Sequence, residues 1–253
     1  MNRPLFFANW KMNHGPTEAR AYMTAFLRIF APRDDRTVAM FPPALSLSAT
    51  RDARGDRTDI HLGVQNIFER EKGAFTGENS APIARDAGAE LVLVGHSERR
   101  HVFGETNLEV AQKVAIAPQF GLTPVLCVGE TLAQRQMDAA EAIVMEQLEI
   151  GISTLAKAST PQTLPLIVAY EPVWAIGTGH SATPEDAASM HRVIRDKLGT
   201  LAPHTDEIPI LYGGSVKPAN ARELMSQADV DGALVGGAAL EARSFADIIK
   251  NSI

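Results

Sequence analysis

The sequence predicts an α/β protein in which eight parallel strands close into a single (β/α)8 barrel. Three observations support this fold class: the chain length, the number of apolar runs and the helical stretches between them. A barrel of this kind commonly has about 250 residues, and the chain has 253. Each run is almost continuously apolar, which is typical of parallel strands covered on both faces. Because no linker rich in proline, glycine or serine divides the sequence, we expect one domain over residues 1–253.

The strand-like runs recur at regular intervals, and we count eight of them, at residues 5–9, 37–41, 60–64, 91–95, 124–128, 166–170, 209–212 and 232–236. Stretches with apolar side chains at helical spacing lie between them, at residues 17–29, 107–119, 132–157, 184–198 and 219–227. This alternation is compatible with a doubly wound sheet or a closed barrel. Eight units in a chain of this length favour the barrel.

Composition and charge disfavour several classes of protein. Lysine and arginine total 24 against 30 aspartate and glutamate, and the resulting net charge of -6 argues against nucleic acid as the main partner. The N-terminal residues lack the apolar stretch of a signal peptide, and no segment approaches the 18 or so apolar residues of a membrane span. Cys127 is the single cysteine and cannot form an internal disulfide. We therefore expect a cytoplasmic protein that binds neither nucleic acid nor membranes.

Polar residues and glycines gather just after the predicted strands, at their C-terminal ends. In (β/α)8 barrels the active site is built on that face, and phosphate commonly binds after strands seven and eight. One polar residue after a strand would carry little information, but the set is large enough to predict a site: Asn9, Lys11, Gln65, Asn66, His96, Ser97, Glu98, Glu130 and Glu171, followed by glycine pairs at 213–214 and 236–237.

The run AYEPVWAIGTG, residues 169–179, is the most informative part of the sequence. Glu171 comes directly after a buried strand, where a carboxylate is costly to desolvate unless it has a task. Pro172 fixes the backbone after it, and Gly177 and Gly179 end the apolar segment that follows. An apolar segment between backbone pivots is typical of a lid. The alternative, an ordinary turn after a buried strand, is less favoured.

Lys11 and His96 are the candidate cation and hydrogen-bond donor. Taken alone, Lys11 would be read as a solvated loop lysine and His96 as a structural histidine. Lys11, however, lies at the predicted rim among aromatic and apolar neighbours, where it could attract an anionic substrate. His96 precedes a helical turn that we expect Ser97 to cap. The positive end of a helix dipole disfavours imidazolium, so we expect a neutral His96.

Two glycine-rich turns, YGGSV at 212–216 and LVGGA at 234–238, each precede an expected helix. Backbone amides at helix starts bind phosphate, although either turn alone is only a weak signal. The sequence contains no P-loop, no dinucleotide fingerprint and no cluster with zinc-ligand spacing, so we expect no cofactor and no metal. A carboxylate base, a neutral donor, a cation and a phosphate cradle suit proton transfer beside a carbonyl on a small phosphorylated substrate.

The whole chain resembles the triosephosphate isomerase family. The matching stretches, in family order, are ANWKMN, GAFTGE, VGHSERR, LCVGET, AYEPVWAIGTG, YGGSV and DGALVGGA. The resemblance implies a TIM barrel that interconverts dihydroxyacetone phosphate and D-glyceraldehyde 3-phosphate, a reaction of glycolysis and gluconeogenesis. It implies Glu171 as the base, His96 as the neutral electrophile and Lys11 as the electrostatic residue; this enzyme is also a standard example of such a site. It further implies substrate contacts from Asn9, Lys11, Gly177, Ser215, Gly236 and Gly237.

The resemblance also implies a homodimer in which the loop around Phe75 and Thr76 enters the neighbouring subunit, with Thr76 near the partner's Asn9. It further implies that Ile176 and Leu234 enclose Glu171 and raise its basicity by desolvation. The sequence departs from the family at His180, where lysine is usual, and at Asn79, where an apolar residue is usual. Two alternatives stay open: an isomerase of four-carbon ketose phosphates with the same mechanism, and a barrel that only binds a partner.

Overall fold

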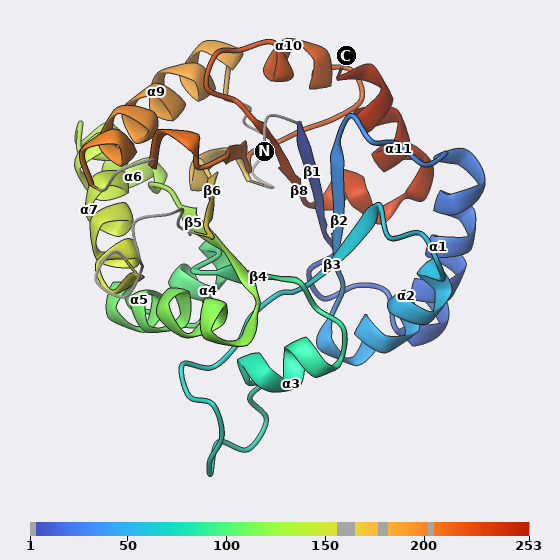
Figure 1. Ribbon diagram of the computed structural model, residues 1–253. Helices are drawn as coiled ribbons and strands as arrows, with labels where there is room; N and C mark the ends of the chain where they lie inside the picture. Colours follow the sequence, from blue (N-terminus) through green and yellow to red (C-terminus); the bar gives the residue numbers. More distant parts are fainter. Residues whose placement is uncertain (1–3, 156–164, 177–181, 202–204, 253) are drawn as a thin grey trace.

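The computed structural model describes residues 4–155, 165–176, 182–201 and 205–252. Eight parallel strands pair in chain order and close into a barrel, with β8 returning to β1 (Figure 1). The strands are β1 (Leu5–Asn9), β2 (Thr37–Phe41), β3 (Ile60–Val64), β4 (Leu91–Val94), β5 (Thr123–Val128), β6 (Ile167–Tyr170), β7 (Ile210–Tyr212) and β8 (Gly232–Val235). This confirms the predicted fold class, and each predicted strand lies within one or two residues of an observed one.

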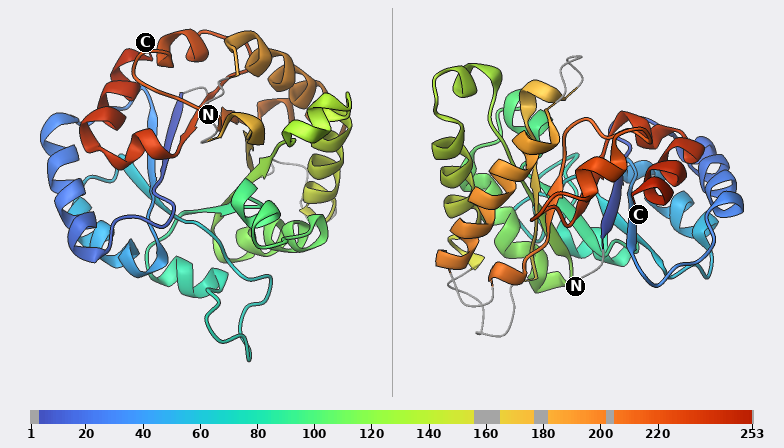
Figure 2. Two further views of the ribbon diagram at one scale, coloured as in Figure 1. Left: turned by 180° about the vertical axis from the view of Figure 1, so that it is seen from behind. Right: turned by 90° about the horizontal axis from the view of Figure 1, so that it is seen from above.

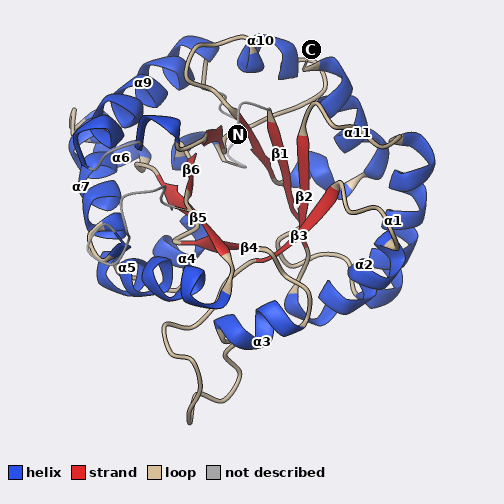
Figure 3. Cartoon of the chain, viewed as in Figure 1, coloured by secondary structure: helices blue, strands red, loops and turns tan. Residues whose placement is uncertain are grey.

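Helices form an outer ring around the strands, as the views from both ends show (Figures 2 and 3). The α-helices are α1 (Pro16–Ile29), α2 (Leu47–Arg54), α3 (Ala81–Asp86), α4 (Ser97–His101), α5 (Asn107–Ile116), α6 (Leu132–Gln136), α7 (Ala140–Ile152), α9 (Pro184–Leu201), α10 (Ala221–Met225) and α11 (Ala242–Asn251). Short 3-10 turns complete the set: η1 (Ala44–Ser46), η2 (Ala117–Phe120), η3 (Val173–Ala175), η4 (Thr205–Glu207) and η5 (Gly237–Leu240).

Alternation along each strand divides the core into two parts. In β1, Phe6 and Ala8 face the helices, whereas Leu5 and Phe7 belong to the cluster that fills the barrel interior. In β6, Ile167 and Ala169 face inward in the same way. Because side chains on a strand repeat with period two, the next inward positions are Asn9 and Glu171. The pleat of the two strands therefore brings both polar residues to the C-terminal end of the interior.

Three details of the predicted elements were wrong. Residues 132–157 were predicted as one helical stretch, but α6 and α7 are separate because Asp138 has a positive φ of 55°; residues 156 and 157 lie outside the described part. Ser97 was predicted to cap α4, but it is the first helical residue and His96 is the cap. The helices α2, α3 and α11 were not predicted, although Phe245, Ile248 and Ile249 already carry a helical apolar spacing in α11.

The segment between β3 and α3 projects away from the barrel in Figure 1. Phe68 and Phe75 pack against each other in it, with ring centroids 4.3 Å apart, and the Phe68 N–H donates to the Asn79 carbonyl. Phe75 is still 41% exposed. The loop is thus partly held by its own side chains and presents an aromatic ring to the outside. In the described part of the chain, no helix is long and apolar enough to cross a membrane.

Candidate active site

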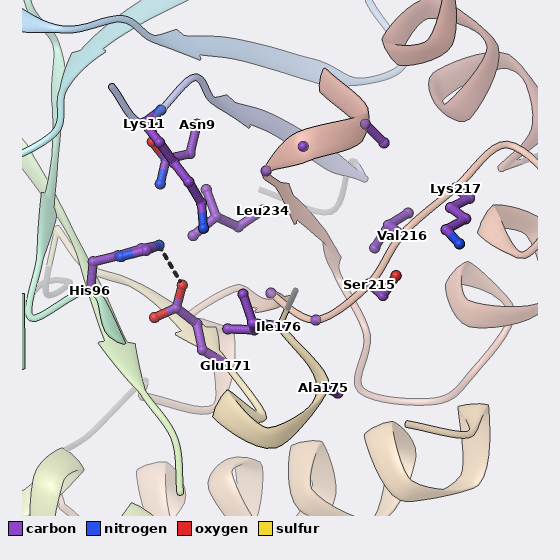
Figure 4. A pocket seen from close by; sticks show the side chains of 15 residues that line it. Asn9, Lys11, His96, Glu171, Ala175, Ile176, Ser215, Val216, Lys217 and Leu234 are labelled. Carbon is purple, nitrogen blue, oxygen red and sulfur yellow. Dashed lines mark hydrogen bonds and ion pairs between the residues drawn. The ribbon is translucent and has the colours of Figure 1, made fainter. Parts of the chain in front are cut away.

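A cavity of about 360 Å³ opens at the C-terminal ends of the strands (Figure 4). It is lined by residues from both ends of the chain, including every described residue that the resemblance implies for catalysis or substrate binding: Asn9, Lys11, His96, Glu171, Ser215, Gly236 and Gly237. Gly177 lies outside the described residues. Since these residues come from five different strand ends, only closure of the barrel brings them together.

Glu171 is buried at the end of β6, and both of its carboxylate oxygens have partners. Oε1 lies 3.0 Å from His96 Nε2, and Oε2 accepts a hydrogen bond from the Ser97 N–H at 2.8 Å. Burial opposes ionisation, but His96, the Ser97 N–H and Lys11 together outweigh it and lower the pKa of Glu171. The expected rise in basicity is therefore not present in this conformation, because the carboxylate still faces His96 and Ser97.

His96 is buried at the start of α4, and each ring nitrogen has a distinct partner. Nδ1 accepts a hydrogen bond from the Glu98 N–H at 3.2 Å, so that nitrogen carries no proton and the ring proton belongs on Nε2, facing Glu171. Burial lowers the pKa of His96, but the neighbouring Glu171 carboxylate prevails and raises it. The Glu98 N–H favours a neutral ring, whereas Glu171 favours the imidazolium. Neutral His96 therefore stays a prediction that depends on where Glu171 points.

Lys11 enters the cavity from a strained turn after β1. Its backbone has a φ of 52°, a region that non-glycine residues rarely adopt. The turn is held by the Lys11 N–H donating to Asn9 Oδ1 at 3.0 Å and by Gln65 Nε2 donating to the Lys11 carbonyl at 2.8 Å. Lys11 Nζ is 2.6 Å from Glu98 Oε1. These contacts restrict the position of the Lys11 ammonium group at the cavity.

The glycine pairs allow the backbone to approach neighbouring side chains of the site closely. A Cβ on Gly213 would lie 2.8 Å from Glu171 Cγ, and one on Gly214 would lie 2.2 Å from the Tyr212 hydroxyl. A Cβ on Gly236 would come within 3.2 Å of Lys11 Cε. Gly237 begins η5, so the second pair leads directly into a helical turn. Both turns therefore line the cavity with residues that have no side chain.

The expected lid, residues 172–179, lies partly within the described residues. Ile176 lines the cavity opposite Leu234, the apolar pair that the resemblance implies. At the root of this segment, Trp174 Nε1 donates to Glu130 Oε1 at 2.7 Å, and the Arg135 guanidinium lies 4.7 Å from the Trp174 ring centroid. Glu130 is fully buried in this network and does not line the cavity. Gly179 and His180 lie outside the described residues.

Ser97 and Glu98 were predicted at the rim but without their partners, and Lys217 was not predicted. The Ser97 N–H holds Glu171, Glu98 pairs with Lys11 across 87 positions of sequence, and Lys217 lines the cavity. The stretch VGHSERR contains the first two, but spacing alone could not indicate their partners. Gln65 and Asn66 line an adjoining cavity of about 220 Å³, which also includes Lys11 and His96. Within the described ranges, no group of three or more His, Cys, Asp or Glu residues could hold a metal ion.

Comparison with known proteins agrees with this geometry. The chain matches the family model of triosephosphate isomerase over residues 4–252. It is 48% identical to a triosephosphate isomerase of Bdellovibrio bacteriovorus over 97% of this chain and 98% of the relative. It is 48% identical to one from Roseiflexus sp. strain RS-1, covering 98% and 97% of the two chains, and 45% identical to one from Solibacter usitatus, covering 99% and 100%. The chain therefore belongs to the triosephosphate isomerase family.

Proposed function

We propose that this protein is an aldose–ketose isomerase that interconverts dihydroxyacetone phosphate and D-glyceraldehyde 3-phosphate. The observation that carries the proposal is the buried pair of Glu171 and His96, 3.0 Å apart, in a cavity that also contains Lys11 and two glycine turns. A carboxylate beside an imidazole can move a proton between adjacent carbons. Membership of the family supports the same reaction.

In the proposed mechanism, Glu171 first leaves His96 and the Ser97 N–H, because both of its oxygens are occupied in this conformation. Its carboxylate then takes a proton from the carbon beside the substrate carbonyl. The C–H electron pair becomes the double bond of an enediolate, and the carbonyl oxygen gains the negative charge. A proton then passes from the hydroxyl oxygen of the first carbon to the former carbonyl oxygen. Return of the abstracted proton to the neighbouring carbon leaves the new carbonyl on the first carbon and completes the isomerisation.

Movement of Glu171 changes the acid–base properties of both residues. The contacts that lower the pKa of Glu171 are lost, so the carboxylate becomes more basic inside the apolar enclosure of Ile176 and Leu234. The carboxylate that raises the pKa of His96 is also withdrawn, so burial and the Glu98 N–H then favour the neutral ring. His96 Nε2–H and Lys11 Nζ would stabilise the charge on the enediolate oxygen.

The phosphate of the substrate is proposed to bind at the glycine turns, with Gly177, Ser215, Gly236 and Gly237 as its contacts and Asn9 as a further substrate contact. Backbone amides that precede helical turns are suited to a dianion. In support, Ser215, Gly236 and Gly237 line one continuous cavity with the proposed catalytic residues. No metal or cofactor is required in this mechanism.

Coupled assays with the two triose phosphates and with four-carbon ketose phosphates test the proposal. We expect rapid turnover of dihydroxyacetone phosphate and D-glyceraldehyde 3-phosphate and at most slow turnover of the tetrulose phosphates. Preferential turnover of a four-carbon substrate would replace the assignment with the alternative isomerase. A folded protein without activity on either class would indicate a barrel that only binds a partner.

We further propose that the protein acts as a homodimer in the cytoplasm as one barrel domain per chain. The adjoining cavity beside Asn9 and Lys11 is lined in part by Met12, which is 95% exposed, and Phe103, which is 67% exposed. Apolar side chains exposed around a cavity favour a protein partner, and the projecting loop with Phe75 and Thr76 supplies a matching segment from a second copy. The single unpaired cysteine favours a reducing compartment.

A further inference from the structure

We propose that Lys217 is a specificity-determining residue that attracts and holds the phosphate of the substrate. This inference rests on the proposed function, because it assumes that the phosphate binds at the glycine turns. Lys217 follows Ser215 by two positions, and both line the cavity. Figure 4 shows them on the side of the cavity away from His96 and Glu171. A bound triose phosphate would thus have its reacting carbons near Glu171 and its phosphate near Lys217.

The backbone at Lys217 is fixed by the side chain of Asn220. The Lys217 N–H donates to Asn220 Oδ1 at 2.7 Å, and Asn220 Nδ2 donates to the Ser215 carbonyl at 3.1 Å. One amide side chain therefore ties together both residues of the proposed phosphate contact. The lysine side chain is exposed, but it extends from a backbone position that cannot move independently of the turn.

Charge balance in the cavity gives Lys217 its importance. Among the described residues that line the cavity, Glu171 is the one acidic residue, and Glu98 neutralises Lys11 from the side at 2.6 Å. Without Lys217, these three side chains leave one net negative charge around a pocket that is to receive a dianion. Lys217 brings the sum to zero, and in the described part of the chain its side chain has no hydrogen-bond or ion-pair partner. Its charge is therefore available to the ligand.

This role differs from that of Lys11. Lys11 is held by Glu98 at the end of the cavity where the reacting atoms are proposed to bind. Lys217 lies at the phosphate end and has no contact with the reacting carbons in the proposed mode of binding. It should therefore affect the capture of the substrate, and hence KM and kcat/KM, but not the chemical step.

The test compares Lys217→Gln and Lys217→Arg with the control Lys250→Gln. The control removes an equal charge at the other end of the barrel, where the strands begin. Lys250 lies in the last turn of α11, and the carbonyl of the preceding residue, Ile249, accepts a hydrogen bond from Arg36, which comes just before β2. For each protein, kcat and KM are measured with D-glyceraldehyde 3-phosphate at low and high ionic strength. Inorganic phosphate serves as the probe of the phosphate site, through its competitive inhibition constant and through direct calorimetric titration.

At low ionic strength we expect Lys217→Gln to raise KM and the inhibition constant of phosphate about three- to tenfold, the effect of one nearby charge on a dianion. The loss should shrink at high salt because the interaction is screened, and kcat should stay within about twofold. Lys217→Arg should retain most of the affinity, and Lys250→Gln should match the wild type. An unchanged KM and phosphate affinity in Lys217→Gln would overturn the inference.

The measurements separate failure of this inference from failure of the proposed function. If the wild type isomerises triose phosphates but Lys217→Gln is indistinguishable from it, only the role of Lys217 is refuted. If the wild type does not isomerise them, the proposed function fails. Calorimetry with inorganic phosphate then still decides whether Lys217 holds an anion, and equal phosphate affinity in the wild type and in Lys217→Gln would refute that as well.

Discussion

The Glu171 carboxylate has a resting position in this structure, between the His96 imidazole and the Ser97 N–H. These contacts satisfy a buried charge. The length of the Glu171 side chain therefore determines both its contacts with His96 and Ser97 and, in the proposed mechanism, its approach to the substrate carbon. The neighbouring Gly213 leaves room for this side chain, since a Cβ there would meet Glu171 Cγ.

Glu171→Asp is expected to lower kcat about a hundredfold, because shortening the side chain misplaces the carboxylate by roughly 1 Å. Circular dichroism should show an unchanged fold. Glu223→Asp, an equal change on the exposed face of α10, is the control and should leave kcat unaltered. Parental turnover in a folded Glu171→Asp protein would remove Glu171 from its proposed role as the base.

A second buried histidine links stability to pH. His191 is fully buried, and its Nδ1 lies 2.8 Å from the Asp229 carbonyl, to which it donates as a neutral ring. Burial lowers the pKa of His191 from its usual value of 6.5 to about 4. The unfolded chain therefore binds a proton more readily than the folded one below pH 6.5 or so. Stability is unaffected by this group above that pH and falls as the pH drops towards about 4.

We expect the free energy of unfolding to decrease by up to about 3 kcal/mol from this group between pH 6.5 and pH 4. Urea unfolding at a series of pH values measures the slope. His191→Gln keeps an N–H donor for Asp229 but cannot be protonated, so its slope over the same window should be smaller. Equal slopes in the two proteins would show that His191 does not titrate as described.

Between elements, Arg135 of α6 connects three parts of the barrel wall. Its Nη1 lies 3.3 Å from Glu130 after β5, its Nη2 lies 2.5 Å from Asp186 in the first turn of α9, and its guanidinium stacks on Trp174 in η3. Glu130 is fully buried and accepts further hydrogen bonds from Tyr170 and Trp174. Arg135 is therefore the cation that compensates a buried carboxylate at the root of the segment after Glu171.

Arg135→Gln is expected to lower the free energy of unfolding by about 1–3 kcal/mol, because the buried Glu130 loses its cationic partner. The measurement is the urea midpoint at constant slope. Arg243→Gln breaks an ion pair of similar geometry with Asp247, but Arg243 is 73% exposed. That control should cost less than about 0.5 kcal/mol. If both variants lose the same small amount, the Glu130 network does not depend on Arg135.

For the whole molecule, the projecting loop and the cavity beside Lys11 are the two places where the proposed homodimer contact would form. Phe75 packs against Phe68 and is 41% exposed. The Lys11 turn has a positive φ and lies next to the exposed Met12. A neighbouring subunit that covered this turn would hold it in a productive geometry more firmly than solvent does.

Phe75→Glu should disrupt the proposed homodimer, because burying the new charge in the interface would cost several kcal/mol. Sedimentation should show a folded monomer with most of its activity lost. Met137→Glu, at an exposed position after α6, is the control and should sediment and react as the wild type. A fully active Phe75→Glu monomer would show that the dimer contact is dispensable for catalysis.

The sequence by itself determined the strands, the closed barrel and the placement of the polar rim. These follow from local patterns: apolar runs of strand length, alternation along each strand, and polar residues where the runs end. The period-two alternation is enough to direct Asn9 and Glu171 into the same interior, because Phe7 and Ala169 precede them on the inward face.

Only the tertiary structure decided which side chains face one another. The contacts of Glu98 with Lys11, of Ser97 with Glu171 and of Arg135 with Asp186 join residues 51 to 87 positions apart. Such contacts depend on the register and tilt of strands in the closed barrel, which no local pattern specifies. For the same reason the sequence did not indicate that Glu171 and His96 lie against each other, an arrangement that alters the pKa of both in the folded chain.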